Sequence, residues 1–179
     1  YVDLQIVLTE PPPLVLNYQV SNYNGYNISC HSFSDGWVDV DIGGSVPPYI
    51  YSWSNATSLQ DLTGVSQGQY ALAVQDINLC EIDLEVVLNE PSPLDLDLSA
   101  ITNYNGYNIS CFGYNDGSVL AQVEGSLPPY SLVWNNNPSL QDNVLDNVFA
   151  GSHFLNVSDQ NNCQIVDTII LLQPDELLS

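Results

Sequence analysis

The sequence predicts an all-β protein made of tandem β-sandwich repeats of about 81 residues. The nine-residue segment NYNGYNISC occurs twice, at 22–30 and again at 103–111. Polar and apolar residues alternate with a period of two, which is typical of half-buried strands. The 11 Gly and 11 Pro among 179 residues supply many turns. No segment predicts a helix.

The alternation is clearest at 36–43, where three aliphatic side chains share one face of the expected strand and Trp37, Asp39 and Asp41 share the other. Further strands are expected near 14–21, 48–54, 69–76 and 81–89. Six or seven strands in each repeat, with Trp53 buried on the third main strand, favour an immunoglobulin-like sandwich.

We expect three parts along the chain. Residues 1–12 are interpreted as the final strand of a preceding repeat, because YVDLQIVLTEPPPL at the front resembles EIDLEVVLNEPSPL at 81–94. The two immunoglobulin-like repeats then span 13–92 and 93–179. Their Pro-rich linkers are short, so a semi-rigid tandem arrangement is expected. We also expect the chain to be a segment of a longer protein.

The charge excludes several classes of partner. The chain has 21 acidic residues, no Lys or Arg, and a formal net charge of −21. Such a surface repels nucleic acids and anionic lipids, so we expect neither as a partner. Direct membrane insertion is not expected either, because no apolar run reaches the roughly 18 residues of a spanning helix. The acidic surface is either solvated in a salty medium or neutralised by divalent cations.

Four cysteines predict one disulfide within each repeat. Cys30 and Cys80 are 50 positions apart, and Cys111 and Cys163 are 52 apart. Each pairing would close a loop of about 50 residues and stabilise the fold by roughly 4 kcal/mol in the chain-entropy model. Disulfides imply an oxidising compartment, so we expect an extracellular, cell-surface location. Zinc is not expected, because no CxxC occurs and no His stands at ligand spacing.

The repeated nonamer contains a strong hairpin signal. Asn24 and Gly25 both favour positive φ, which a type I′ turn requires. The flanking tyrosines can pair across the hairpin, and Ile28 can anchor the return strand in the core. The alternative is a Tyr- and Asn-rich tip that binds a ligand once per repeat. Its candidate residues are Tyr23, Tyr26, Tyr104 and Tyr107.

A carbohydrate site is conceivable on the polar face of 36–43. Trp37 could stack on a sugar while Asp39 and Asp41 bind its hydroxyls or a cation. The alternative is an exposed strand face, which the second copy favours, because it carries other residues at the matching positions. Those residues are Ser118, Leu120 and Gln122.

Calcium is the cofactor to consider, although a protein without any cofactor is the expectation. The candidate ligands recur in both copies and are Asp35, Asp61, Asp76, Asp116, Asp142 and Asp159. Calcium prefers six to eight oxygen ligands. However, aspartate is also common as a cap in turns, which is the alternative role. We expect no enzymatic activity, because the two histidines stand at non-equivalent positions and no nucleophile motif is present.

The combined motifs resemble the SprB-type repeat of Bacteroidota gliding adhesins. In the first copy they are Cys30, Asp-Gly at 35–36, GGSVPPYIYSWSN at 43–55, LTGVSQGQYALAVQD at 62–76, Cys80 and Glu-Pro at 90–91, and most recur in the second. The resemblance implies type IX secretion, surface display and adhesion. It implies adjacent repeats as partners, together with a surface polysaccharide or neighbouring filament chains.

The second copy departs from the first at three positions. Gly43 becomes Glu124, Tyr70 becomes His153, and Asp167 falls where Leu84 would point inward. We expect a bulge or a slipped register in the last strand at Asp167.

Overall fold

The computed structural model describes residues 5–177. The chain divides into two compact units, with the boundary between Glu90 and Pro91. Every regular element in the described range is a strand, so the predicted all-β class is confirmed. No helix among the described residues is long and apolar enough to cross a membrane.

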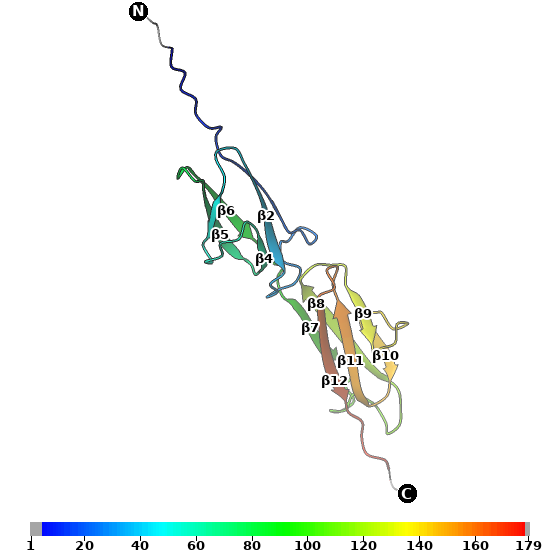
Figure 1. Ribbon diagram of the computed structural model, residues 1–179. Coiled ribbons are helices and arrows are strands. Elements are labelled where there is room, and N and C mark those ends of the chain that lie inside the picture. Colours follow the sequence, from blue (N-terminus) through cyan, green and yellow to red (C-terminus); the bar gives the residue numbers. More distant parts are fainter. Residues whose placement is uncertain (1–4, 178–179) are drawn as a thin grey trace, which may run out of the picture. The chain divides into compact units, whose positions relative to one another are not determined.

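The first unit is a sandwich of two three-stranded antiparallel sheets (Figure 1). One sheet has the order β1-β2-β4 and the other β3-β5-β6. Apolar side chains from both sheets form the core between them, including Val38, Trp53 and Leu72. The strands are β1 (Val15–Val20), β2 (Gly36–Gly43), β3 (Ile50–Trp53), β4 (Leu62–Val65), β5 (Gly68–Gln75) and β6 (Glu81–Leu88).

The second unit repeats this plan. Its sheets have the orders β7-β8-β10 and β9-β11-β12. Val119, Trp134 and Leu155 belong to the core between them. The strands are β7 (Leu94–Ala100), β8 (Gly117–Gly125), β9 (Ser131–Trp134), β10 (Val144–Val148), β11 (Gly151–Ser158) and β12 (Gln164–Leu171).

The strand order is that of an immunoglobulin-like sandwich. First, second and fourth strands share one sheet, and third, fifth and sixth share the other, as in the ABE and CFG parts of immunoglobulin domains. The expected buried tryptophans are confirmed, since Trp53 is 3% and Trp134 1% exposed. Their indole N–H groups donate to Leu59 O at 3.1 Å and Asp142 O at 2.9 Å, which satisfies the polar atom of each buried ring.

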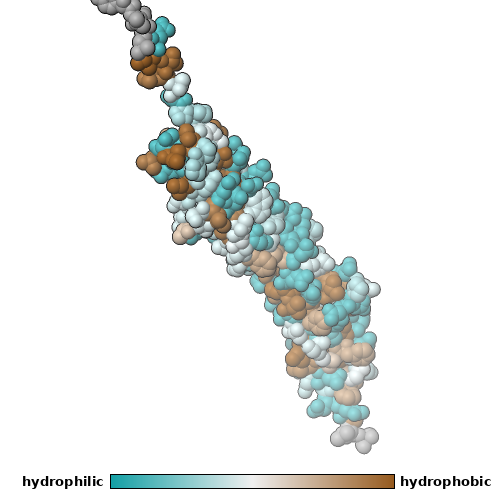
Figure 2. All heavy atoms as spheres, in the orientation of Figure 1, coloured by the Kyte–Doolittle hydropathy of each residue, from teal (hydrophilic) through white to brown (hydrophobic). Residues whose placement is uncertain are grey.

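The described part of the amino-terminal segment, residues 5–12, has no regular strand. Its Ile6, Val7 and Leu8 are 73%, 82% and 91% exposed. Figure 2 shows hydrophobic residues, in brown, at the amino-terminal end of the described chain. Residues 1–4 lie outside the described range, and the assignment of this segment to a preceding repeat stays a prediction.

Two of the departures between the copies have a structural explanation. Gly44 has a φ of +78°, and an added Cβ would lie 1.9 Å from Pro13 O, whereas Gly43 has open space around it. Only the second glycine is therefore required, and Glu124 is tolerated at the first position. The expected irregularity at Asp167 is wrong, because β11 and β12 pair without a register shift from Gly151 to Ser158. Asp167 is exposed, as a side chain on an edge strand can be.

Candidate functional site: the two ends of each unit

The nonamer begins with the predicted tight hairpin. Asn24 and Gly25 have φ values of +52° and +101°. Tyr23 and Tyr26 exchange two backbone hydrogen bonds, with N···O distances of 2.7 and 3.2 Å. Tyr104 and Tyr107 form the same bridge in the second unit. The type I′ hairpin is therefore confirmed in both copies.

The rest of the nonamer is attached to the end of the last strand. The backbone N–H groups of Asn27 and Ile28 both donate to Asn89 O, at 2.9 and 3.1 Å, and Asn89 N donates back to Asn27 Oδ1 at 3.0 Å. Ile28 is fully buried, which confirms it as a core anchor. Asn108 and Ile109 bind Leu172 in the same way. We call this end of each unit, where the chain leaves the last strand, the exit end.

The aspartate of the Asp-Gly pair fixes the loop that follows the nonamer hairpin. Asp35 accepts hydrogen bonds from Ser29 N at 3.1 Å and Ser29 Oγ at 2.5 Å. In the second unit, Asp116 accepts from Ser110 N at 3.1 Å. The hydrogen bond from the Ser110 side chain, followed by that from its backbone, holds the pKa of Asp116 below its ordinary value. These aspartates therefore serve as caps of a loop.

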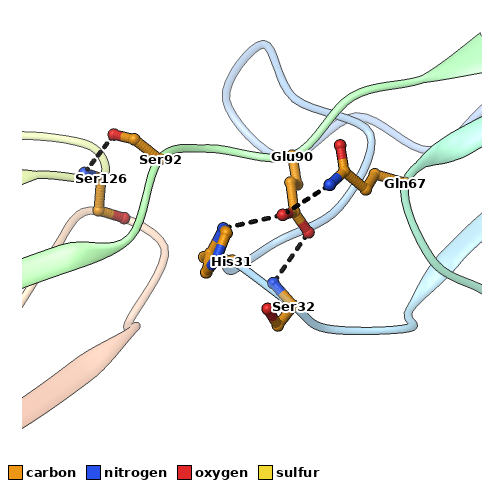
Figure 3. A network of polar contacts seen from close by, with 6 residues as sticks. All are labelled: His31, Ser32, Gln67, Glu90, Ser92 and Ser126. Carbon is orange, nitrogen blue, oxygen red and sulfur yellow. Dashed lines mark hydrogen bonds and ion pairs between the residues drawn. The ribbon is translucent and has the colours of Figure 1, made fainter.

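Glu90 organises the exit end of the first unit (Figure 3). Its Oε2 accepts from Ser32 N at 2.8 Å, while its Oε1 accepts from Gln67 Nε2 at 3.0 Å and lies 2.8 Å from His31 Nδ1. The Glu90 side chain is only 6% exposed. The second unit keeps the backbone contact with a neutral residue, because Gln173 Oε1 accepts from Gly113 N at 3.0 Å.

The opposite end of each unit, where the chain enters the first strand, is built around a buried aspartate. We call it the entry end. Asp76 Oδ2 accepts from Ser45 Oγ at 2.5 Å, and its Oδ1 accepts from Asn78 N and Cys80 N, both at 2.8 Å. The hydrogen bond from the Ser45 hydroxyl is the main reason that the pKa of Asp76 is lowered. Ser45 N in turn donates to Pro12 O at 2.8 Å, which ties the entering chain to this loop.

The entry end of the second unit has the same contacts. Asp159 Oδ2 accepts from Ser126 Oγ at 2.5 Å, and its Oδ1 accepts from Asn161 N and Cys163 N at 2.8 Å. Ser126 N donates to Ser92 O at 3.2 Å and to Ser92 Oγ at 3.1 Å, the contact drawn in Figure 3. The buried aspartate is therefore a repeated structural cap.

The predicted disulfides Cys30–Cys80 and Cys111–Cys163 are wrong. Among the described cysteines, Cys80 and Cys111 are free and exposed, whereas Cys30 and Cys163 are buried and disulfide-bonded. The reason is the distance within a unit. Cys80 precedes the eight-residue strand β6 and Cys30 lies near its far end, so about 26 Å of extended chain separates them. A disulfide needs Cα atoms within about 7 Å.

The candidate sugar-binding residues share one exposed strand face, as expected. Trp37 is 36% exposed, and Asp39 and Asp41 are exposed beside it on β2. Asn17 and Gln19 of β1 lie opposite these two aspartates. Together, these strands line a shallow hollow of about 300 Å³. In the second unit the matching Ser118 is buried and donates to Asp146, so this face is not built twice.

The six candidate calcium ligands do not come together. No group of three or more His, Cys, Asp or Glu able to hold a metal occurs within residues 5–177. Four of them already accept the hydrogen bonds described above, namely Asp35, Asp76, Asp116 and Asp159. Asp61 Oδ1 accepts from Val40 N at 2.9 Å. Asp142 is exposed, and its backbone oxygen accepts the hydrogen bond from the indole N–H of Trp134. These contacts favour the alternative role of the aspartates as caps of turns over a role as calcium ligands.

The sequence interpretation missed Ser45 and Glu90 as organising residues. Ser45 has a signal in the sequence, because Ser126 stands 81 positions later and makes the same contact with an aspartate. Glu90 has a weaker signal in the sequence, because its counterpart Gln173 is a different residue that provides only the same side-chain acceptor oxygen.

The comparisons with known proteins give one family match, which lies within the second unit. No curated protein sequence matches the chain. Among solved structures, the chain resembles the C-terminal 282-residue fragment of intimin, solved in complex with the intimin-binding domain of the translocated intimin receptor, at 11% identity and a TM-score of 0.38. That match covers 93% of this chain and 55% of the fragment. Residues 104–139, which include most of the second nonamer and the buried Trp134, match the SprB repeat family. The chain therefore carries a SprB-type repeat.

Proposed function

We propose that this chain is a non-enzymatic segment of an extracellular, cell-surface adhesin, in which each sandwich acts as a spacer unit. The observation that carries the proposal is that the repeated motifs make structural contacts within their own unit. In both copies the nonamer, the Asp-Gly pair and the buried aspartate at the entry end are engaged in contacts within the unit. Repeated motifs whose polar groups are engaged in building the unit are what a spacer requires.

The composition supports an extracellular location. A disulfide persists in an oxidising environment, and Cys30 and Cys163 are disulfide-bonded. The chain has no Lys or Arg, so trypsin-like proteases find no cleavage site in it. A net charge of −21 also favours the solubility of the chain.

The spacer role predicts how size grows with repeat number. Chains of two, four and six repeats would be compared by small-angle X-ray scattering under oxidising conditions. A semi-rigid array predicts a maximum dimension that rises in proportion to the number of repeats. Growth with about the square root of that number, as for flexibly linked units, contradicts the spacer role.

A second candidate function is carbohydrate binding on the first unit. It is favoured by the exposed Trp37 beside Asp39 and Asp41, and by the shallow hollow next to them. A glycan array with the intact chain tests this candidate. Binding that is lost in Trp37→Ala, but kept in the control Phe149→Ala at another exposed aromatic, supports it. An array without signal in the presence and absence of calcium excludes it.

We propose that calcium is not needed to rigidify the chain. Because most of the candidate aspartates already accept hydrogen bonds from protein donors, we expect a chelator to leave the thermal midpoint unchanged. A fall of several degrees on chelation, reversed by added calcium, would restore calcium as a ligand.

A further inference from the structure

The two exposed free thiols lie at different ends of their units, one at an entry end and the other at an exit end. Cys80 closes the entry-end loop of the first unit, where its N–H donates to Asp76 Oδ1 at 2.8 Å. Cys111 completes the nonamer at the exit end of the second unit. Each unit therefore has one cysteine at each end.

The repeat provides a counterpart in the same backbone setting for each free thiol. Cys30 completes the first nonamer as Cys111 completes the second, and Cys163 N donates to Asp159 Oδ1 at 2.8 Å as Cys80 N donates to Asp76. Both counterparts are buried, at 6% and 8% exposure, and both are disulfide-bonded. The local fold at each kind of end is thus compatible with a disulfide. What Cys80 and Cys111 lack is a partner thiol within reach among the described residues.

Two aromatic side chains lie beside the free thiol at the exit end of the second unit, in a hollow that Asp175 and Glu176 also line. Cys111 lines a hollow of about 530 Å³, which is also lined by Phe112 and Tyr114. These two rings are 48% and 57% exposed. The equivalent of Phe112 in the first unit is the polar His31.

The entry end of the first unit has a matching apolar character. Ile77 and Leu79, on either side of Asn78 and next to Cys80, are 58% and 71% exposed. Their counterparts in the second unit are the polar Gln160 and Asn162. The apolar surroundings of Cys80 therefore complement those of Cys111, since burying both surfaces against each other removes apolar area from water.

We propose that Cys111 forms a disulfide with the entry-end cysteine of a following repeat, and that Cys80 forms one with the exit-end cysteine of a preceding repeat. This inference deepens the proposed spacer function and rests on it. Each bond joins two thiols, which lose two protons and two electrons. The oxidant is a low-molecular-weight disulfide or a thiol–disulfide oxidoreductase, which is reduced to two thiols.

The intact chain can test the pairing by itself, because a second copy supplies the missing end. Cys80→Ser keeps only the exit-end thiol free, and Cys111→Ser keeps only the entry-end thiol free. The two variants would be mixed in a buffer of oxidised and reduced glutathione and separated by non-reducing electrophoresis. Random pairing would give as much mixed dimer as the two homodimers together, so we expect the mixed dimer to exceed their sum, and the double variant to stay monomeric. Because the three dimers have the same mass, mass spectrometry after chymotrypsin digestion would quantify the Cys111–Cys80, Cys111–Cys111 and Cys80–Cys80 bonds.

A further variant separates docking from thiol chemistry. Phe112→Ser in the Cys80→Ser background should slow mixed-dimer formation about tenfold, because a buried ring is lost from the contact. Its alkylation by iodoacetamide should keep the original rate. Homodimers that together equal or exceed the mixed dimer, or no dimer although both thiols are alkylated, would overturn the proposal. Either outcome would leave the proposed cell-surface location unaffected, because immunogold labelling of intact cells tests that location independently.

Discussion

The Cδ1 atom of Ile28 lies 2.6 Å from the position that a Cβ would occupy on Gly36, and Val65 O lies 2.9 Å from the same position. The second unit has the same relationship between Ile109 and Gly117, also at 2.6 Å. The glycine of the Asp-Gly pair is thus required by the isoleucine of the nonamer. Two motifs that are separated in sequence are joined by one packing contact.

Gly36→Ala should destabilise the first unit by about 1–3 kcal/mol, because overpacking forces side chains or backbone to shift. Ile28→Val removes the Cδ1 atom from this contact. We expect the double variant Ile28→Val/Gly36→Ala to cost less than the sum of the single variants, by urea denaturation followed with tryptophan fluorescence. Strictly additive costs would show that the two residues do not compete for this space.

Gly43 and Gly44 form a matched pair. Gly44→Ala should be strongly destabilising, because its φ is +78° and its Cβ would lie 1.9 Å from Pro13 O. Gly43→Ala should be close to neutral, since nothing lies within 4 Å of its added Cβ. Thermal melting of both variants checks this. Equal losses at the two positions would contradict the explanation given for Glu124.

The lowered pKa of Asp76 predicts a pH dependence of stability. A carboxylate with a lowered pKa in the folded state stabilises the fold above its unfolded value, near about 4, and this contribution is lost as pH falls through the folded value. Asp76→Asn removes the ionised acceptor of Ser45. The gap in thermal midpoint between the wild type and this variant should be constant from about pH 5 to 7 and should narrow below about pH 4. A gap that does not change down to pH 3 would contradict this origin.

Glu90 should be replaceable by glutamine but not by alanine. Glu90→Ala removes the acceptor of Ser32 N together with the other contacts of a side chain that is only 6% exposed, at a cost of about 0.5–1.5 kcal/mol. Glu90→Gln can keep this bond, as Gln173 does with Gly113. Urea denaturation of both variants would measure the difference. A glutamine variant as unstable as the alanine variant would show that the charge, and not the acceptor, is required.

Much of the fold could be predicted because it depends on local signals. Alternation on 36–43 and the Asn24-Gly25 turn each specify geometry within a few residues, and Trp53 marks the sandwich core. The cysteine pairing could not be predicted in this way. The spacing of Cys30 and Cys80 is compatible with a bond, but it does not reveal that they lie at opposite ends of β6.

The candidate sites were predicted unevenly. The exposure of Trp37 follows directly from the alternation of apolar and polar residues along 36–43. The role of Asp76 could not be decided from sequence, because an acidic residue that binds a cation and one that caps a loop have the same composition signal. The half-buried hydroxyl partner Ser45 distinguishes them, and it is brought to Asp76 from another loop.

The most direct test of the proposed function is labelling of intact cells that carry the gene for this chain. Antibodies raised against the oxidised chain would be applied with and without permeabilisation and detected by immunogold electron microscopy. A surface adhesin segment predicts dense labelling of unpermeabilised cells, at a distance from the outer membrane. Labelling that requires permeabilisation would contradict the account.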